Sequence, residues 1–577
     1  MEQYYTNEQN VQILIALLKE HGIKKVVASP GSTNVTFVGS IQQDSFFEIY
    51  SSVDERSAAY IACGLAAESG EAVALSCTGA TASRNYYPGL TEAFYRKLPV
   101  LAITSTQEES KIGHLVPQVL DRTVQPKDTV KCSVHLQTVK DEDDRWDCMV
   151  KANKAILELD HHGKGPVHIN LTTRYSSNFT IKQLPPVRKI ERVVLHTDFP
   201  SLPTGKIAIF IGSHVRMSKA LTASIDAFCA AYNAVAFVDT TSNFTGRYRV
   251  PYFLVAQQKL DTANNCPDLL IHIGEMSDLS GMIKAPKNVW RVSEDGLLAD
   301  RYHTLRYVFE MPEQSFFEHY TKDCEKQNDT YLQSCLEECK RIWNKMPELP
   351  FSHLWVASKL HNKLPQNSTL HLGILSPLRS WGYFPISSSI EVYCNQGGFG
   401  IDGNISSLLG ASLAHPDKIY YGVVGDLSFF YDMNVLGNRH IKRNIRVLLI
   451  NNSLGAEFHL FKQLNSTCVN EIDKYLSAGG HFGCQSPLLV KCYAESLGYE
   501  YLTASSKDEF ENIYQRFITP EMTDRPMIFE VFTDVNDENK ALYQMHNIEI
   551  SSEYKGKQII KKILGKKNIE TIKGIVK

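Results

Sequence analysis

The sequence predicts an α/β protein of three domains, in which mostly parallel sheets are flanked by helices. Short apolar runs rich in β-branched residues alternate with longer helical patterns along most of the chain, and this alternation is typical of parallel sheets. The length of 577 residues corresponds to about three or four domains. Prolines at 185–186 and around 347–350 separate the α/β blocks, so we expect domains at 1–184, 185–345 and 346–550.

The first block opens with a helix and continues with strands. The apolar run over 11–18 predicts a helix that ends near Gly22, and a strand over 25–28 follows it. Ser29-Pro30-Gly31-Ser32 then has the composition of a turn. Further strands are expected at 72–76, 100–104 and 167–171.

The second and third blocks repeat this alternation. In the second block we expect strands at 207–211, 234–238, 269–273 and 289–292. A polar helical stretch over 315–345 leads to the third block. There we expect strands over 391–393, 419–424 and 445–450, and helices over 405–414 and 429–436.

The C-terminal segment 551–577 differs from the rest in composition. Residues 553–577 carry eight lysines, arranged so that one helical face would be apolar and the other basic. A docked helix or a solvated tail is the ordinary interpretation. An acidic partner or a membrane surface is the alternative.

Composition excludes several classes of protein. With 43% hydrophobic and 21% charged residues, the chain has the make-up of a soluble globular protein, and a formal net charge of −3 gives no reason to expect nucleic acid as a partner. No apolar run approaches the ~20 residues of a membrane helix, and the start has no secretory-signal pattern. The thirteen cysteines form no CxxC pair, so we expect reduced thiols and a cytoplasmic protein.

An acidic residue ends one predicted strand, and paired asparagines end the next. Asp426 follows the strand over 419–424, and Asn451-Asn452 closes the strand over 445–450. Open α/β sheets bind ligands at the carboxyl ends of their strands, so Asp426 and Asn452 can converge. Their oxygen atoms suit Mg²⁺. Two ordinary turns are the alternative.

Glu55 stands at the start of a helix of small residues that runs to Ala66. A surface glutamate favoured by the helix dipole is the ordinary interpretation. The functional alternative is a carboxyl group buried against an apolar wall.

The run Gly398-Phe399-Gly400-Ile401-Asp402-Gly403 fits the pattern G-x-G-x-x-G between a strand and a helix. This is the context of a dinucleotide fingerprint, so a nicotinamide or flavin oxidoreductase is an alternative from another class. A single match is weak evidence, because glycines also let the backbone approach other ligands closely.

Together these motifs resemble the thiamine-diphosphate (ThDP) enzyme superfamily, and within it the SEPHCHC synthases of menaquinone biosynthesis. The resemblance covers roughly residues 7–547 and leaves out the basic tail. It is carried by Ser29-Pro30-Gly31-Ser32, the Asp54–Ala59 segment, Asn85-Tyr86-Tyr87-Pro88, Gly400-Ile401-Asp402-Gly403, Gly425-Asp426-Leu427-Ser428 and Asn451-Asn452.

The resemblance implies a ThDP- and Mg²⁺-dependent 2-oxo acid decarboxylase or carboligase, whose enamine is protonated or added to an acceptor. It implies that Glu55 bonds N1′ of the cofactor's pyrimidine, that Ile401 supports the bent cofactor, and that Gln118 and Arg379 act in the active site. The implied metal ligands are Asp426, Asn452 and the Leu454 carbonyl, and the implied neighbours of the diphosphate are Gly425, Leu427 and Ser428.

Three arginines of the family pattern are replaced in this chain. Thr33 (next to Ser32), Gln107 and Gln396 stand where SEPHCHC synthases have arginines, and Arg379 remains. Thr and Gln cannot reproduce the two-pronged contact of Arg with a carboxylate. We therefore expect a smaller 2-oxo acid, such as pyruvate, with an unassigned acceptor. A SEPHCHC synthase using 2-oxoglutarate and isochorismate, and a non-catalytic ThDP-binding homologue, are alternatives.

The resemblance also implies a homodimer or homotetramer. In this superfamily different chains hold the two ends of the cofactor, so Glu55 of one protomer is expected to meet the Asp426 site of another. The sequence gives no direct evidence for FAD in the central domain.

Overall fold

The computed structural model describes residues 4–122, 124–258, 260, 262–456, 476–481 and 485–550. The chain forms two compact units. Unit 1 comprises Met1–Phe199 and Asp295–Glu310, and unit 2 comprises Pro200–Glu294 and Met311–Lys577. The expected domain boundaries at 185 and 346 stay a prediction, and the lysine-rich segment 551–577 lies outside the described residues.

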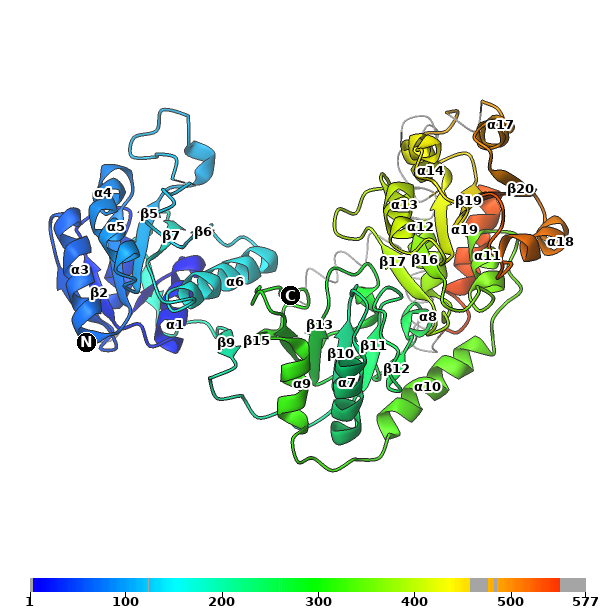
Figure 1. Ribbon diagram of the computed structural model, residues 1–577. Coiled ribbons are helices and arrows are strands. Elements are labelled where there is room, and N and C mark those ends of the chain that lie inside the picture. Colours follow the sequence, from blue (N-terminus) through cyan, green and yellow to red (C-terminus); the bar gives the residue numbers. More distant parts are fainter. Residues whose placement is uncertain are drawn as a thin grey trace, which may run out of the picture. The chain divides into compact units, whose positions relative to one another are not determined.

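Unit 1 is built on a six-stranded parallel sheet (Figure 1). In spatial order its strands are β3 (Glu48–Ser51), β2 (Lys25–Ala28), β4 (Val73–Thr78), β5 (Val100–Thr106), β7 (Val167–Thr172) and β6 (Cys132–Leu136). The four strands expected in this block are confirmed. The structure adds β3 and β6, which the sequence did not predict.

Helices cover both faces of this sheet. They are α1 (Gln9–Glu20), α2 (Val35–Ile41), α3 (Glu55–Ser69), α4 (Ala80–Asn85), α5 (Tyr87–Tyr95), the 3₁₀ turn η1 (Glu109–Lys111) and α6 (Glu142–Glu158). Helices α1 and α6 bury one apolar cluster against the sheet, and α3, α4 and α5 bury another on the opposite face (Figure 1). The predicted helix over 11–18 is confirmed, and all eight of its side chains are buried.

Two strand pairs complete unit 1. The antiparallel pair is β1 (Tyr5–Thr6) with β8 (Phe179–Ile181), and the parallel pair is β9 (Glu191–Val194) with β15 (Leu305–Glu310). An ionic cluster anchors β15, because the Glu310 carboxylate accepts from His162 Nε2 at 2.7 Å and lies 2.8 Å from His161 Nε2.

Unit 2 contains two groups of parallel strands. The first follows the order β12 (Arg249–Val250), β11 (Val235–Val238), β10 (Ile207–Ile211), β13 (Leu269–Ile273), β14 (Asn288–Val292). The second is a six-stranded sheet in the order β17 (Glu391–Cys394), β16 (Thr369–Leu372), β18 (Tyr420–Gly425), β19 (Ile445–Asn451), β21 (Met527–Phe532), β20 (Glu500–Ala504). All seven strands expected in these blocks are confirmed, and so is the α/β class with mostly parallel sheets.

The helices of unit 2 fall into two groups along the chain. The first group is α7 (Lys219–Tyr232), α8 (Phe253–Ala256), η2 (Ser280–Met282), α9 (Glu313–Thr321) and α10 (Thr330–Trp343). The second is α11 (His353–Leu360), α12 (Ser376–Gly382), α13 (Asn404–Ala414), α14 (Asp426–Asp432), η3 (Met433–Gly437), α17 (Leu489–Ser496), α18 (Lys507–Phe517) and α19 (Val535–Met545).

The polar helical stretch expected over 315–345 consists of two helices, α9 and α10. Another helix prediction needs correction. The helix expected over 429–436 begins at Asp426 instead, as α14, and ends in the 3₁₀ turn η3. It starts early because Gly425 is extended (φ −79°, ψ 167°) and the Asp426 carboxylate accepts from the Leu427 N–H at 2.7 Å, which satisfies a first-turn donor.

Candidate active site in two halves

Asp426 lies at the carboxyl end of β18, next to the end of β19. The two strands are parallel neighbours, with Gly425 opposite Ile450. The Asp426 side chain is buried, and this burial raises its pKa to about 7, although hydrogen bonds from the N–H groups of Leu427, Ser453 and Leu454 oppose the rise. Among the described residues, no Lys or Arg pairs with this carboxylate.

The loop after β19 lies beside Asp426, because the N–H groups of Ser453 and Leu454 face the Asp426 carboxylate. Ser453 adopts φ +66°, and its N–H donates to Asn451 Oδ1 at 3.0 Å. Leu454 N–H donates to Asn452 Oδ1 at 3.4 Å. The structure therefore brings Asp426 together with the Asn452–Leu454 loop, as the strand-end pattern predicts.

A second loop is tied to the start of α14. The Ser428 hydroxyl donates to the Ile401 carbonyl at 2.6 Å, and Asn404 Nδ2 donates to Ser428 Oγ at 2.8 Å and to the same carbonyl at 2.9 Å. Gly403 adopts φ +73°, a left-handed conformation that disfavours other residues. These bonds fix the backbone of half-buried Ile401 beside the residues that follow β18.

The donor set at this edge fits Mg²⁺ with a diphosphate. It offers a buried carboxylate, a side-chain amide and backbone carbonyls, which are the hard oxygen ligands that Mg²⁺ prefers. A metal ligand of this kind is a buried carboxylate without a basic partner, and no described Lys or Arg neutralises Asp426. Asp426, Asn452 and Leu454 would hold the metal, with Gly425, Leu427 and Ser428 beside the diphosphate.

Glu55 is the first residue of α3 in unit 1. Asp54 caps this helix, since its carboxylate accepts from the N–H groups of Arg56 (2.8 Å) and Ser57 (3.2 Å). Asn85 Nδ2 donates to Glu55 Oε2 at 3.3 Å. Within unit 1 the Glu55 side chain is half-buried, so this unit alone does not enclose it as the functional interpretation expects.

The predicted substrate contacts of unit 1 differ in exposure. Thr33 is buried, and its hydroxyl donates to the Ser105 carbonyl at 2.8 Å and accepts from Gly79 N–H at 3.3 Å. Ser32 is exposed, and Gln107 is half-buried and accepts from Lys111 Nζ at 2.7 Å. Gln118 is exposed, with φ +65°.

Comparisons with known proteins identify the family. A family model described as "Thiamine pyrophosphate enzyme, N-terminal TPP binding domain" matches residues 9–125. Two relatives named 2-succinyl-5-enolpyruvyl-6-hydroxy-3-cyclohexene-1-carboxylate (SEPHCHC) synthase are each 32% identical to the chain. The Phocaeicola vulgatus protein matches over 94% of this chain and 99% of its own length, and the Bacteroides thetaiotaomicron protein over 93% and 98%. The chain belongs to the SEPHCHC synthase family.

Membership in the SEPHCHC synthase family confirms the predicted superfamily, and the chain is a ThDP-dependent enzyme. Of the two reactions that the sequence left open, the names of the relatives favour the SEPHCHC synthase alternative over an unassigned decarboxylase or carboligase. A solved structure, the Rhodococcus jostii RHA1 thiamine diphosphate-dependent 4-hydroxybenzoylformate decarboxylase, is 17% identical over 91% of this chain and 99% of its own, with a TM-score of 0.39. Among the described helices, none is long and apolar enough to cross a membrane.

In unit 2, two predicted substrate residues of this SEPHCHC synthase family member meet at Asp278. Gln396 is buried, donates to Thr241 Oγ1 at 2.9 Å and accepts from Asp278 N–H at 2.7 Å. Arg379 donates to the Asp278 carboxylate through Nε (2.6 Å) and Nη2 (3.3 Å). Gln396 and Arg379 are thus brought together, and both have partners within the protein.

One candidate site residue, at the carboxyl edge of the unit 1 sheet, was not predicted from the sequence. Arg122 is buried, and it lies in the loop between η1 and β6. A lone arginine in a loop gives no periodic signal, and only its place four residues after Gln118 pointed toward the active site.

Proposed function

We propose that the chain catalyses the ThDP- and Mg²⁺-dependent decarboxylation of a 2-oxo acid and joins the remaining carbon unit to an acceptor. The reaction named by its relatives, SEPHCHC formation from 2-oxoglutarate and isochorismate, is the first candidate. The observation that carries the proposal is the oxygen-rich edge at Asp426, in a chain that matches SEPHCHC synthases over nearly its whole length.

Predicted residues from both units have tasks in this proposal. ThDP, when bound, supplies the electron sink that a 2-oxo acid needs in order to lose CO₂. Asp426, Asn452 and the Leu454 carbonyl hold the metal and thereby the diphosphate. Ile401, fixed by Ser428, supports the cofactor, and Glu55 holds its pyrimidine end.

Assembly is part of the proposal. We propose three domains at 1–184, 185–345 and 346–550, in a homodimer or homotetramer whose active sites lie between chains. Half-buried Glu55 supports this arrangement, because a carboxyl group that activates a cofactor needs a partner surface to exclude water from it.

A second candidate is a smaller 2-oxo acid, such as pyruvate, with another acceptor. Two observations favour it. Thr33 and Gln396 are neutral, buried and hydrogen-bonded within the protein, so neither offers a carboxylate the contact that an arginine would give. Arg379 is already paired with Asp278.

The test measures CO₂ release by enzyme loaded with ThDP and Mg²⁺, from 2-oxoglutarate, pyruvate and 2-oxobutyrate, each with and without isochorismate. The first candidate requires 2-oxoglutarate to be preferred and isochorismate to be consumed. A preference for pyruvate that isochorismate does not alter selects the second. Absence of CO₂ from every 2-oxo acid contradicts the proposed chemistry.

A further inference from the structure

Arg122 has a buried guanidinium, and the part of the chain that the structure describes provides no counter-ion for it. Only 3% of the residue is exposed, and Nη2 makes a short hydrogen bond to the neutral Asn170 side chain. Among the described residues, Nε and Nη1 have no hydrogen-bond partner, and no carboxylate forms an ion pair with the group. Burial lowers the pKa of Arg122 only to about 10, so the guanidinium stays charged at neutral pH.

A buried guanidinium without an anionic partner destabilises the folded protein unless a ligand provides that partner. Buried polar groups in native proteins are nearly always hydrogen-bonded, and an unpaired buried charge is strongly destabilising. The backbone nonetheless holds the residue in place. The carbonyl of Asp121 accepts from Arg84 Nη2 at 3.1 Å, and the carbonyl of Arg122 accepts from Gln125 Nε2 at 2.8 Å.

The guanidinium lies at the carboxyl edge of the unit 1 sheet. A Cβ atom added to Gly79, which follows β4, would lie 3.4 Å from Arg122 Nη1 and 3.0 Å from the Ser105 carbonyl at the end of β5. Glycine at this position therefore leaves room for the guanidinium. Open α/β sheets bind ligands at this edge.

One of the positions where SEPHCHC synthases have an arginine lies at this same edge of the sheet. Thr33 occupies that position, and its hydroxyl accepts from Gly79 N–H at 3.3 Å. The Arg122 guanidinium packs against the same glycine. Ser105 Oγ, also at this edge, is buried without a hydrogen-bond partner in the described chain.

We propose that Arg122 binds a carboxylate of the substrate at this edge and takes over from the arginines that Thr33 and Gln107 replace. The inference rests on the proposed function for the identity of the ligand. The carboxylate belongs either to the 2-oxo acid donor or to the acceptor, and the experiment separates these two sources. Arg122 then supplies a positive charge where Thr33 and Gln107 provide none.

The experiment measures equilibrium binding of two unreactive carboxylates to ThDP- and Mg²⁺-loaded enzyme by calorimetry. Glutarate imitates the donor and salicylate the ring acceptor. In R122Q, affinity for one of the two is expected to fall about 10- to 100-fold, the usual loss for a hydrogen bond to a charged group. The KM for the corresponding substrate should rise in parallel. R122K keeps the charge but not the fork, so it should retain part of the affinity and decides the matter if R122Q does not fold.

The matched control is R96Q, which removes an exposed arginine of the same unit. It should bind both probes as the wild type does, and the affinity for ThDP should be unchanged in all variants. Equal probe binding by wild type and R122Q, or no probe binding by wild type, overturns the inference. This readout needs no turnover, so it stays separate from the CO₂ assay that tests the proposed function.

Discussion

At the scale of single residues, cofactor binding depends on Asp426. Asparagine has nearly the same shape as aspartate but no charge. D426N should therefore weaken Mg²⁺-dependent ThDP binding by about 100-fold or more, a larger loss than is usual when a residue that only hydrogen-bonds a metal ligand is changed. The cofactor-free variant should be at least as stable as the wild type, because a buried carboxyl group of raised pKa contributes nothing that Asn lacks. Titration of ThDP by intrinsic fluorescence, with and without Mg²⁺, measures the effect.

Asp432 provides a control for this prediction. It is equally buried in the same helix, and its carboxylate accepts from both the N–H and the hydroxyl of Ser406 at 2.6 Å. D432N should therefore lower the melting temperature while leaving Mg²⁺-dependent ThDP affinity nearly intact. If the two variants lose ThDP affinity equally, Asp426 has no special role as a ligand.

Glu538 should make stability depend on pH. Burial raises its pKa from 4.5 to about 7, although hydrogen bonds from His353 N–H (2.9 Å) and Thr533 Oγ1 (2.8 Å) oppose the rise. Below pH 4.5 the carboxyl group is protonated in both folded and unfolded chains, and its contribution is complete. Between pH 4.5 and 7 the unfolded chain loses its proton first, so the free energy of unfolding falls by up to about 3 kcal/mol.

E538Q isolates this contribution, because glutamine still accepts both hydrogen bonds through Oε1 but does not titrate. The melting temperature of E538Q minus that of the wild type should increase from pH 4.5 to 7 and then level off. Thermal melts of both proteins across this range measure it. A difference that stays constant with pH would show that folding does not raise the pKa of Glu538.

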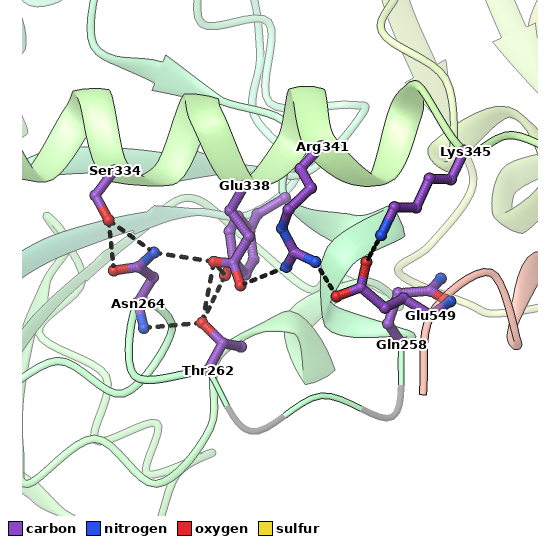
Figure 2. Close-up of polar contacts among 9 residues, drawn as sticks. Gln258, Thr262, Asn264, Ser334, Glu338, Arg341, Lys345 and Glu549 are labelled. Carbon is purple, nitrogen blue, oxygen red and sulfur yellow. Dashed lines mark hydrogen bonds and ion pairs between the residues drawn. The ribbon is translucent and has the colours of Figure 1, made fainter. Parts of the chain in front are cut away.

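At the scale of elements, the carboxylates of Glu338 and Glu549 hold α10 against the rest of unit 2 (Figure 2). Glu338 on this helix accepts from Thr262 Oγ1 at 3.0 Å and from Asn264 Nδ2 at 2.9 Å, and Arg341 and Lys345 pair with Glu549. E338Q should cost about 1–3 kcal/mol, because the amide oxygen can still accept from both donors, which bond to the same oxygen of Glu338, but it lacks the negative charge that strengthens these bonds. Denaturant melts measure it, and E337Q, an exposed change on the same helix, should cost little.

The sequence predicted elements best where the apolar pattern was continuous. Strands such as β10, β13 and β19 are buried along their whole length, so apolar residues dominate their sequences. It missed β3, an edge strand of mixed polarity, whose residues are mostly exposed. The start of α14 was misplaced because its first residue serves both as helix terminus and as a strand-end carboxylate.

The candidate site was predictable to the extent that it lies at strand ends. Asp426 and Asn452 follow adjacent parallel strands, and sheet topology brings such residues together. Arg122 could not be found in this way, because its position depends on the path of a long loop and on the space left by Gly79. The pairing of Gln396 with Asp278 is likewise a tertiary contact between distant segments.

At the scale of the whole molecule, the two halves of the proposed site lie on different compact units. Glu55 belongs to unit 1, and Asp426 belongs to unit 2. If an active site combines Glu55 of one chain with Asp426 of another, two inactive variants can complement each other. A homodimer formed from one E55Q chain and one D426N chain then has one site with both changes and one site with neither.

Co-expression of differently tagged E55Q and D426N chains, followed by two-step purification, therefore tests the assembly. Each variant alone should be nearly inactive, while the purified mixed dimer should recover about half of wild-type activity, because one of its two sites is intact. A site built within a single chain predicts no recovery, since every site would then carry one change. Dimers of two differently tagged E55Q chains, purified in the same way, should remain inactive whether or not the chains share their sites. Turnover recovered by the dimer of E55Q with D426N must therefore come from a site that two chains share.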